Sequence, residues 1–463
     1  MAFEIGQEKK TQILFLQTKP LPKWLACCFM TNQKVTIFWF RRDLRLEDNQ
    51  GLYHALQGDF PVQPVFIFDR HILDKLSNPA DARVHFIHQE LERMQTQFIA
   101  QGTTLDVRVG NPLEVWKQLL QDYEIGRVYA NRDYEPYARE RDKLIYDLLA
   151  ENGITFKAKK DHVIFEKSEV VKADGKPYTV YTPFGKLWKQ RLTSAHLQEV
   201  SSSSTANWHQ QTVREIPSLA SFGFQPTDIP LPDRTPDLKV IGKYHETRDF
   251  PAIRGTSRLG LHLRFGTISI RQLARQTQAL NEKYLNELIW REFYQSILWH
   301  FPEVVQHNFS RKYDGIVWRN DESEFEKWCE GQTGYPIVDA GMRELNETGY
   351  MHNRVRMIVA SFLTKHLLIH WSWGEAYFAE KLLDFELASN NGGWQWAAGT
   401  GVDAAPYFRV FNPYIQTEKF DPQLNYVRKW VPEFQSLDYP KPIVDHKIAR
   451  ERAIATYKEG LGS

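Results

Sequence analysis

The first third of the chain alternates between strand patterns and helical patterns, and this alternation limits the folds that it can form. Four continuous apolar runs predict buried strands, at residues 35–40, 64–69, 105–110 and 127–132. The segments 81–100 and 112–125 lie between these runs and carry apolar residues at helical spacing. Strands that alternate with helices form a parallel sheet covered on both faces. The sequence therefore predicts an α/β, Rossmann-like sheet domain over residues 34–158.

The rest of the chain has a different pattern. Residues 159–235 contain a serine-rich run and several prolines, which predict a long and mostly irregular linker. From residue 236 to residue 463 strand patterns nearly vanish. The run VRMIVASFLTKHLLIHW at 355–371, for example, keeps apolar residues at helical spacing. We therefore predict a second, all-helical domain over residues 236–463.

Length and charge narrow the function classes. A chain of 463 residues is long enough for two domains with separate cores. The net charge is +1, so any nucleic-acid site must be a local basic patch. The three cysteines have no zinc-site spacing, which predicts no metal and argues against a disulfide framework. No apolar run approaches the roughly 20 residues that span a bilayer, so we expect no membrane contact.

The start of the chain needs a separate interpretation. Residues 1–33 contain apolar patches, but lysines and prolines between positions 19 and 23 interrupt them. A secretory core would be continuous and followed by small residues, so we reject that interpretation. Met30 stands directly ahead of the first strand pattern. Our hypothesis is that Met30 is the natural start and that residues 1–29 are an upstream extension or a disordered tail.

Two stretches of the helical half carry residues suited to a flat, charged ligand. GTSRLG at 255–260 combines hydroxyl groups and an arginine where backbone N–H groups can hold a phosphate. A capped helix with an exposed arginine explains this stretch alone better. NELIWREFY at 286–294 forms one helical stripe of Glu287, Trp290, Arg291 and Tyr294. Two interpretations of that stripe are equally good: the lining of a ligand pocket, or a surface ion pair beside a core tryptophan.

Two further stretches are open to structural explanations. Arg354 and Arg356 point in different directions on a helix, so one of them is expected to face the interior. A buried arginine needs a carboxylate, which Asp384 or Glu386 supplies as a ligand-site pair or as a structural salt bridge. The run GTGVDA at 399–404 matches a dinucleotide fingerprint but lacks the preceding strand. We therefore predict no dinucleotide site there.

Six motifs together carry a family resemblance. They are FRRDLRLEDN (40–49), RDFPAIRGTSRL (248–259), LNELIWREFY (285–294), GQTGYPIVDAGMRELNETGYMHNRVRMI (331–358), LASNNGGWQWAAGTGVDAAPYFRVFNP (387–413) and EKFDP (418–422). In this order and spacing the chain resembles the photolyase/cryptochrome flavoproteins, most closely class I cyclobutane pyrimidine dimer photolyases. The resemblance implies a lyase that binds FAD in its helical domain. Blue light then drives electron transfer from reduced FAD to a dimer flipped out of DNA.

The resemblance also assigns the cofactor residues. The predicted FAD contacts are Tyr244, Thr256, Ser257, Arg258, Leu259, Gly260, Asn353, Arg356, Asp384, Phe385, Glu386 and Asn390. Arg356 and Asp384 are expected to form a buried pair. Gly260 stands where many relatives carry serine. Asn390 falls at the position that faces flavin N5, where photolyases typically carry Asn and plant-type cryptochromes carry Asp.

The same resemblance implies a catalytic and DNA-binding set. Glu287 matches the carboxyl that hydrogen-bonds the dimer and steadies its anion, and Met357 favours cyclobutane dimers over six-four photoproducts. The predicted DNA contacts are Arg248, Glu287, Trp290, Arg291, Tyr294, Asn353, Arg354, Met357, Trp396 and Arg409. Trp318, Trp371 and Trp394 match a chain of three tryptophans that carries an electron from the surface to oxidised flavin.

The resemblance finally implies a second, antenna chromophore in the sheet domain. ANRDYEPYARERD at 130–142 matches the antenna-side motif, but Tyr137 and Ala138 replace the Asn-Glu of folate-binding relatives. A folate, a deazaflavin and a flavin stay open as its identity. We expect a monomer that acts on dimer-containing DNA in the cytoplasm, with the nucleoid. Two alternatives are a cryptochrome-type photoreceptor without repair activity and a flavin oxidoreductase, which would need a second dinucleotide site.

Overall fold

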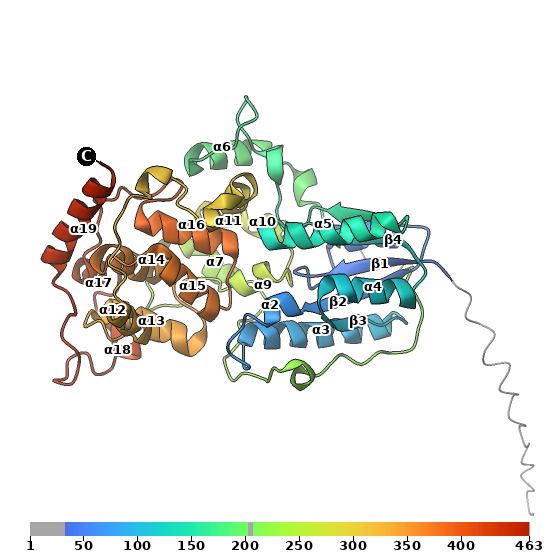
Figure 1. The fold of residues 1–463 in the computed structure, drawn as a ribbon, viewed down its shortest axis with the longest axis horizontal. Helices are drawn as coiled ribbons and strands as arrows, with labels where there is room; N and C mark the ends of the chain where they lie inside the picture. The colour runs from blue at the N-terminus through green and yellow to red at the C-terminus, as the bar shows by residue number, and fades with distance from the viewer. Residues whose placement is uncertain (1–32, 202–206, 463) are drawn as a thin grey trace, which may run out of the picture.

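The computed structural model describes residues 33–201 and 207–462, which form two lobes side by side (Figure 1). One lobe holds a parallel sheet and the other is helical, as the sequence predicts. The hypothesis about residues 1–29 and a start at Met30 concerns a segment outside the described residues.

The sheet has five parallel strands in the order β3-β2-β1-β4-β5. They are β1 Val35–Phe40, β2 Val62–Asp69, β3 Asp106–Gly110, β4 Ile125–Asn131 and β5 Thr155–Lys159. The first four coincide with the predicted runs within three residues. The fifth strand was not predicted, because its sequence TFKAK is partly exposed and has no apolar run. β5 lies at a sheet edge, where only one neighbour covers it.

Helices cover both faces of this sheet (Figure 1). They are α1 Gln50–Leu56, α2 Arg70–Leu73, α3 Ala82–Ala100, α4 Pro112–Asp122 and α5 Pro136–Glu151. Side chains of β1 alternate between two cores, because successive residues of a strand point to opposite faces. Phe38 and Phe40 join the core against α3, whereas Ile37 and Trp39 join the core against α4 and α5.

The linker contains one helix that the sequence pattern did not predict. Helix α6 Tyr181–Arg191 packs on helix α11 of the helical lobe, and Figure 1 shows the two side by side. Pro183 and Gly185 interrupt its helical pattern, so only Phe184 and Trp188 mark the buried face. The Trp188 indole N–H donates to the buried Glu292 carboxyl of α11 over 2.6 Å.

The helical lobe confirms the predicted all-helical domain. Its helices are α7 Leu238–Gly242, α8 Tyr244–Thr247, α9 Gly260–Arg264, α10 Ile270–Thr277, α11 Glu282–His300, α12 Glu322–Glu330, α13 Pro336–Thr348, α14 Asn353–Ser361, α15 Trp371–Lys381, α16 Leu387–Ala398, α17 Pro413–Phe420, α18 Asn425–Trp430 and α19 His446–Gly460. The predicted continuous helical run at 355–371 is interrupted. Helix α14 passes into a π-helical turn at Phe362–His366 and the chain bends before α15. Apolar spacing does not distinguish a π-helical turn from a further α-helical turn, so the sequence missed it.

Buried ion pairs join the two lobes. Arg42, two residues after the end of β1, donates to Glu386 of the helical lobe over 2.7 Å. Arg271 of α10 donates to Asp161, which follows β5, over 2.8 Å. All four side chains are nearly inaccessible to solvent. The lobes are therefore fixed relative to one another by charges that are expensive to leave unpaired.

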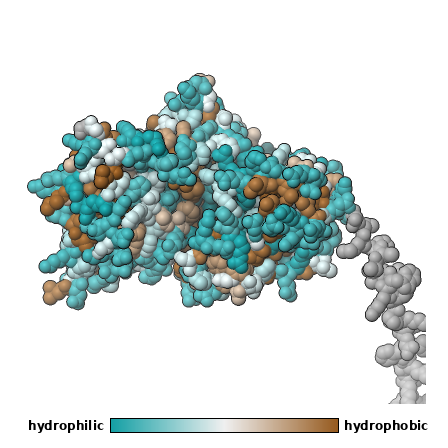
Figure 2. Space-filling model, in the orientation of Figure 1, coloured by the Kyte–Doolittle hydropathy of each residue, from teal (hydrophilic) through white to brown (hydrophobic). Residues whose placement is uncertain are grey.

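Most apolar side chains lie inside the molecule. The face drawn in Figure 2 is largely hydrophilic, with hydrophobic side chains gathered mainly over the sheet lobe. Among the described residues, none of the helices combines the length and the apolar character that crossing a bilayer requires.

Candidate functional site

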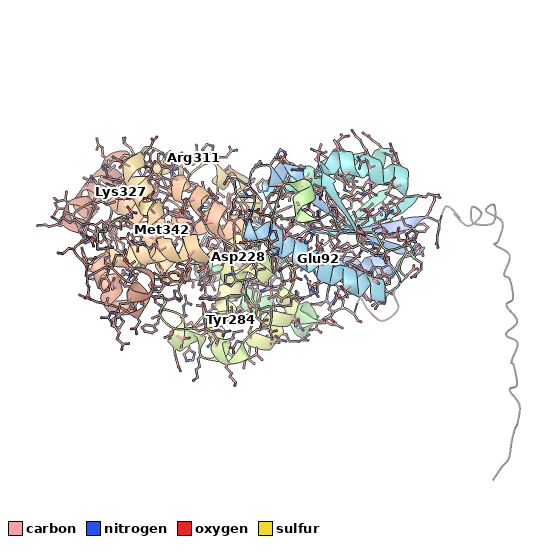
Figure 3. All side chains as sticks on the ribbon, turned by 90° about the horizontal axis from the view of Figure 1, so that it is seen from below. Glu92, Asp228, Tyr284, Arg311, Lys327 and Met342 are labelled. Atoms are coloured by element: carbon pink, nitrogen blue, oxygen red, sulfur yellow. The ribbon has the colours of Figure 1, made fainter. Side chains whose placement is uncertain are left out.

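The loop before α9 holds the predicted phosphate-binding residues. The Thr256 hydroxyl lies 3.0 Å from the Tyr350 hydroxyl, and the Tyr284 hydroxyl donates to the Ser257 hydroxyl over 3.1 Å. Figure 3 labels Tyr284 near the middle of the molecule's long axis. Arg258 has a φ of 54°, an uncommon left-handed conformation for a residue other than glycine. Its guanidinium lies 4.4 Å from the centre of the Tyr350 ring.

Arg356 of α14 pairs with Asp384 over 2.9 Å, so the structure brings these two predicted residues together. The pair is half-buried, with 25% and 21% of the two side chains exposed. Gly260 lies against the same carboxylate, because a Cβ at that position would be 2.7 Å from Asp384 Oδ2. A serine would therefore displace Asp384, which gives a physical reason for glycine at this position.

The other predicted cofactor residues near this pair differ in how far they are buried. Leu259 is buried and Tyr244 is nearly so, which makes them walls of the site. Phe385 is partly buried against the helical core. Asn353 is exposed at the first turn of α14. Polar contacts to a ligand are therefore available from Asn353, Arg356 and the 256–258 loop.

Glu386 and Arg291 form part of the connection between the lobes. The Glu386 carboxyl accepts from Arg42 and from Arg291, the latter over 2.8 Å. Arg291 also donates to the His162 carbonyl, and only 12% of its side chain is exposed. The predicted DNA contact of Arg291 stays a prediction; its guanidinium is mostly buried and paired with Glu386. Sequence spacing showed the stripe of α11 but not which face the sheet lobe covers.

Asn390 lies on α16 beside a carboxyl that the sequence did not single out. Its side-chain amide donates to the Glu375 backbone carbonyl of α15 over 3.0 Å. Burial raises the pKa of Glu375 to about 7, although side-chain hydrogen bonds from Asn391 and Asn390 oppose that rise. The Asn390 amide is therefore held in one orientation next to a group that titrates near neutrality.

The two glycines after the asparagine pair face different surroundings. A Cβ on Gly392 would overlap the Tyr294 ring of α11, so this glycine permits close helix packing. A Cβ on Gly393 would meet no protein atom within 4 Å. Space beside the α16 backbone is thus available to a ligand at Gly393, and Tyr294 contributes to packing between α11 and α16.

Glu287 pairs with Arg248 on one wall of the site. Burial raises the pKa of Glu287, and the charge and hydrogen bond of Arg248 oppose this rise. The two side chains are 29% and 25% exposed, so a ligand can reach them. The arrangement offers a ligand a hydrogen-bonding carboxyl with an adjacent cation.

Trp290 of α11 is stacked on Tyr181 at the start of α6. The ring centres are 3.8 Å apart and the planes differ by 5°. Tyr181 also donates to the Asn286 carbonyl over 3.0 Å, which fixes its ring. The sequence pattern did not indicate Tyr181, because this residue lies in the linker, far along the chain from α11. One face of the Trp290 ring is therefore covered by Tyr181, and the rings of Phe293 and Tyr294 also lie against Trp290, each with its centre 5.5 Å away.

The remaining predicted DNA contacts lie around α14 and the loop after α16. Arg354 pairs with Asp249 over 2.6 Å and lies 3.6 Å from the Met357 sulfur. Met357 and Trp396 are half-buried, whereas Arg409 is exposed. This set offers apolar and aromatic surface beside cations, as stacking and phosphate contact require.

The three predicted redox tryptophans differ in exposure. Trp394 and Trp371 are 2% and 1% exposed, and Trp318 is half-buried. All three belong to or pack against the same helical core. The His370 ring contacts both Trp371 and Trp318, with its centre 5.2 Å from the centre of each tryptophan ring. The arrangement supplies aromatic rings from the interior toward the surface.

These residues fit a flavin dinucleotide. Thr256, Ser257 and Arg258 line a cavity of about 400 Å³, and their hydroxyl and guanidinium groups suit a pyrophosphate. The open space at Gly393 and the fixed Asn390 amide suit the edge of a flat ring. The described ranges contain no cluster of His, Cys, Asp and Glu that could hold a metal.

Comparison with known proteins gives two family matches. Residues 36–202 match a model described as DNA photolyase, and residues 284–438 match the FAD binding domain of DNA photolyase. A curated relative from Halobacterium salinarum, named deoxyribodipyrimidine photo-lyase, is 37% identical and covers 92% of this chain and 99% of its own.

Two crystal structures resemble this fold closely. A bacterial class III photolyase from Agrobacterium tumefaciens has a TM-score of 0.82 and 35% identity, covering 93% of this chain and 98% of its own. An archaeal photolyase from Sulfolobus tokodaii, solved with two FAD molecules, has a TM-score of 0.79 and 37% identity. It covers 92% of this chain and 99% of its own.

Proposed function

The chain belongs to the DNA photolyase family, and we propose that it is a light-driven lyase that splits cyclobutane pyrimidine dimers in DNA. The observation that carries this function is the 37% identity over 92% of the chain to a deoxyribodipyrimidine photo-lyase. The six sequence motifs and the two-lobed fold agree with it. The class I assignment stays a prediction, since the similar structures include a class III photolyase.

The proposed cofactor site uses the loop before α9, α14 and α16. Thr256, Ser257 and Arg258 hold the pyrophosphate, and the Arg356–Asp384 pair and Asn390 orient the ring system. Bound FAD, once reduced, supplies the electron for ring splitting when blue light excites it. The chain positions the ring: the backbone at Gly393 leaves room for it, and Tyr244 and Leu259 exclude water.

The proposed lesion site uses Glu287, Trp290, Met357 and Trp396. The aromatic rings and the thioether replace the stacking that a flipped dimer loses on leaving DNA. The Glu287 carboxyl, whose pKa burial raises, donates a hydrogen bond to a dimer carbonyl and steadies the added negative charge. Arg248, Arg354 and Arg409 hold the flanking phosphates, which is the local basic patch that a net charge of +1 requires.

The proposed antenna site lies at the ends of β2 and β4. Tyr137 donates to the Asp69 carboxyl over 2.5 Å, and Arg141 lies 4.9 Å from the Trp39 ring centre. These aromatic and charged groups suit a second flat chromophore. Its identity as a folate, a deazaflavin or a flavin stays open. The proposal takes the protein as a monomer that works on DNA in the cytoplasm.

A photoreceptor without repair activity is the alternative, and mutation of the tryptophan chain separates the two. Trp394→Phe is expected to block photoreduction of the oxidised protein but to leave repair by chemically reduced protein largely intact. Trp116→Phe, a buried tryptophan of the sheet lobe, serves as the matched control. If the unaltered protein undergoes photoreduction, but neither it nor Trp394→Phe repairs dimers after chemical reduction, the photoreceptor is favoured. Equal loss of both activities in Trp394→Phe alone would contradict the role of Trp394.

A further inference from the structure

One tyrosine of the linker lies directly against the proposed lesion site. Tyr181 is the first residue of α6, and its half-buried ring is stacked on the Trp290 indole of α11. The two ring centres are only 3.8 Å apart and the ring planes differ by 5°. Aromatic rings left to themselves prefer an offset or an edge-to-face arrangement with more distant centres. Other contacts must therefore hold Tyr181 in this position.

Two hydrogen bonds to distant parts of the chain hold Tyr181 in place. Its hydroxyl donates to the Asn286 carbonyl over 3.0 Å, one helical turn before Trp290. Its backbone N–H donates to the Asp403 carboxylate over 3.2 Å. Val180, the N-cap residue of α6, makes no side-chain capping bond, so Asp403 caps this helix from 222 positions away. Because Asp403 lies in the loop after α16, Tyr181 joins the linker to both α11 and the end of α16.

The Trp290 ring is confined before any ligand arrives. Tyr181 covers one of its faces, and the rings of two neighbours on α11, Phe293 and Tyr294, lie 5.5 Å from it. The Trp290 side chain is nevertheless half-buried, so part of the indole is accessible. A side chain that is already fixed loses little rotational freedom when a ligand contacts it. Burial and then the nearby Glu287 carboxylate raise the pKa of Tyr181, so its hydroxyl also lies near the proposed lesion carboxyl.

We propose that Tyr181 is a positioning residue for lesion recognition, which holds the Trp290 indole in the plane that a flipped pyrimidine dimer contacts. This role rests on the lesion site of the proposed function. A dimer that has left the DNA stack reaches the indole, whereas undamaged bases stay stacked in the duplex. Undamaged DNA is bound through its phosphates instead. Tyr181 therefore contributes to the preference for damaged DNA and not to DNA binding in general.

The test measures dissociation constants of the FAD-containing protein in the dark, for a duplex with a single thymine dimer and for the same duplex without it. Tyr181→Leu removes the flat ring and should weaken dimer binding roughly tenfold, with binding of the undamaged duplex unchanged. Tyr181→Phe keeps the ring and loses only the bond to Asn286, so it should recover most of the affinity. Tyr146→Leu, at an exposed tyrosine of α5, is the matched control and should change neither constant.

A double-mutant cycle separates a positioning role from a general structural one. Because Tyr181 acts through Trp290, Tyr181→Leu should weaken dimer binding little further in a Trp290→Ala background. Losses that simply add, or equal weakening for both duplexes, would overturn the proposal. Asp403→Ala leaves both rings in place and removes the cap, so it tests the same role if Tyr181→Leu does not fold. It should weaken dimer binding severalfold, and an unchanged preference for the damaged duplex would likewise overturn the proposal.

The unaltered protein distinguishes failure of this proposal from failure of the proposed function. If it binds both duplexes equally and repairs no dimers under blue light, the lyase function is wrong and the role of Tyr181 falls with it. If it prefers the damaged duplex and repairs it, but Tyr181→Leu shows the same preference, the role of Tyr181 alone is wrong.

Discussion

At the scale of single residues, Glu287 combines opposing influences on one carboxyl. Burial favours its neutral form, and Arg248 favours its charged form. A group balanced in this way can donate to a dimer carbonyl and tolerate added negative charge nearby. The sequence indicated the residue through the family motif. It did not indicate the partner, because Arg248 lies 39 positions earlier in the chain.

We expect Glu287→Ala to lower the repair yield severalfold while leaving the FAD content nearly unchanged. The hydrogen bond to the dimer is lost, whereas the pyrophosphate residues are untouched. The measurements are dimers repaired per absorbed photon and the ratio of flavin to protein absorbance. Glu282→Ala, an exposed change on the same helix, is the control and should alter neither. A colourless Glu287→Ala protein would instead point to a structural role.

The raised pKa of Glu375 predicts that the free energy of unfolding depends on pH. Its pKa is about 7 in the folded protein against 4.5 in the unfolded chain. Between these values the folded state holds a proton that the unfolded state has released, so stability falls as pH rises. Glu375→Gln should therefore raise the urea midpoint at about pH 8 but not at about pH 4. Glu380→Gln on the same helix is the exposed control. An equal shift at both pH values would refute the assignment.

At the scale of elements, the sequence predicted the strands and helices that have regular apolar spacing. It did not predict the elements that form because of contacts with distant parts of the chain. The first four strands and the helices α3 and α4 follow from apolar spacing, because each buries one continuous set of side chains. Strand β5, helix α6 and the π-helical turn were missed, since exposure, Pro183 and tertiary contacts determine them. The family motifs allowed candidate site residues to be named, and these assignments stay predictions. Tyr181 and Glu375 could not be named in this way, because their contacts are with residues distant in sequence.

At the contact between α15 and α16, replacing a glycine by alanine is expected to destabilise the protein at one position and to stabilise it at another. Gly374 of α15 lies under the Trp394 ring, so Gly374→Ala should force the helices apart and destabilise the protein by about 1–3 kcal/mol. In the FAD-free protein, Gly393→Ala on α16 meets no protein atom and should stabilise that helix by up to about 1 kcal/mol. Urea unfolding of both variants checks this. Equal destabilisation would contradict the proposed contact between Gly374 and Trp394.

At the scale of the whole molecule, Glu386 links the sheet lobe to the helical lobe. Its carboxyl accepts from Arg42 of one lobe and from Arg291 of the other. The same residue lies four positions before Asn390 on the chain. Because a buried carboxylate between two arginines is costly to neutralise, the cofactor side of α16 and the sheet lobe are held in one arrangement.

We expect Glu386→Gln to lower the free energy of unfolding by about 3–5 kcal/mol, since two buried arginines lose a charged partner. Asp147→Asn removes the exposed pair with Lys143 and should change it by at most about 1 kcal/mol. Denaturant unfolding followed by sheet-lobe and helical-lobe tryptophan signals is the measurement. Similar small changes in both variants would show that the link does not stabilise the molecule.

The reduced protein is expected to repair cyclobutane dimers with light. The direct measurement supplies chemically reduced protein with DNA that carries only cyclobutane dimers and follows thymine absorbance under blue light. We predict that absorbance returns in the light, stays constant in the dark, and does not change with DNA that carries only six-four photoproducts. If the absorbance does not return with either duplex or single-stranded dimer DNA, from protein that holds its full complement of FAD, the protein is not a cyclobutane dimer lyase.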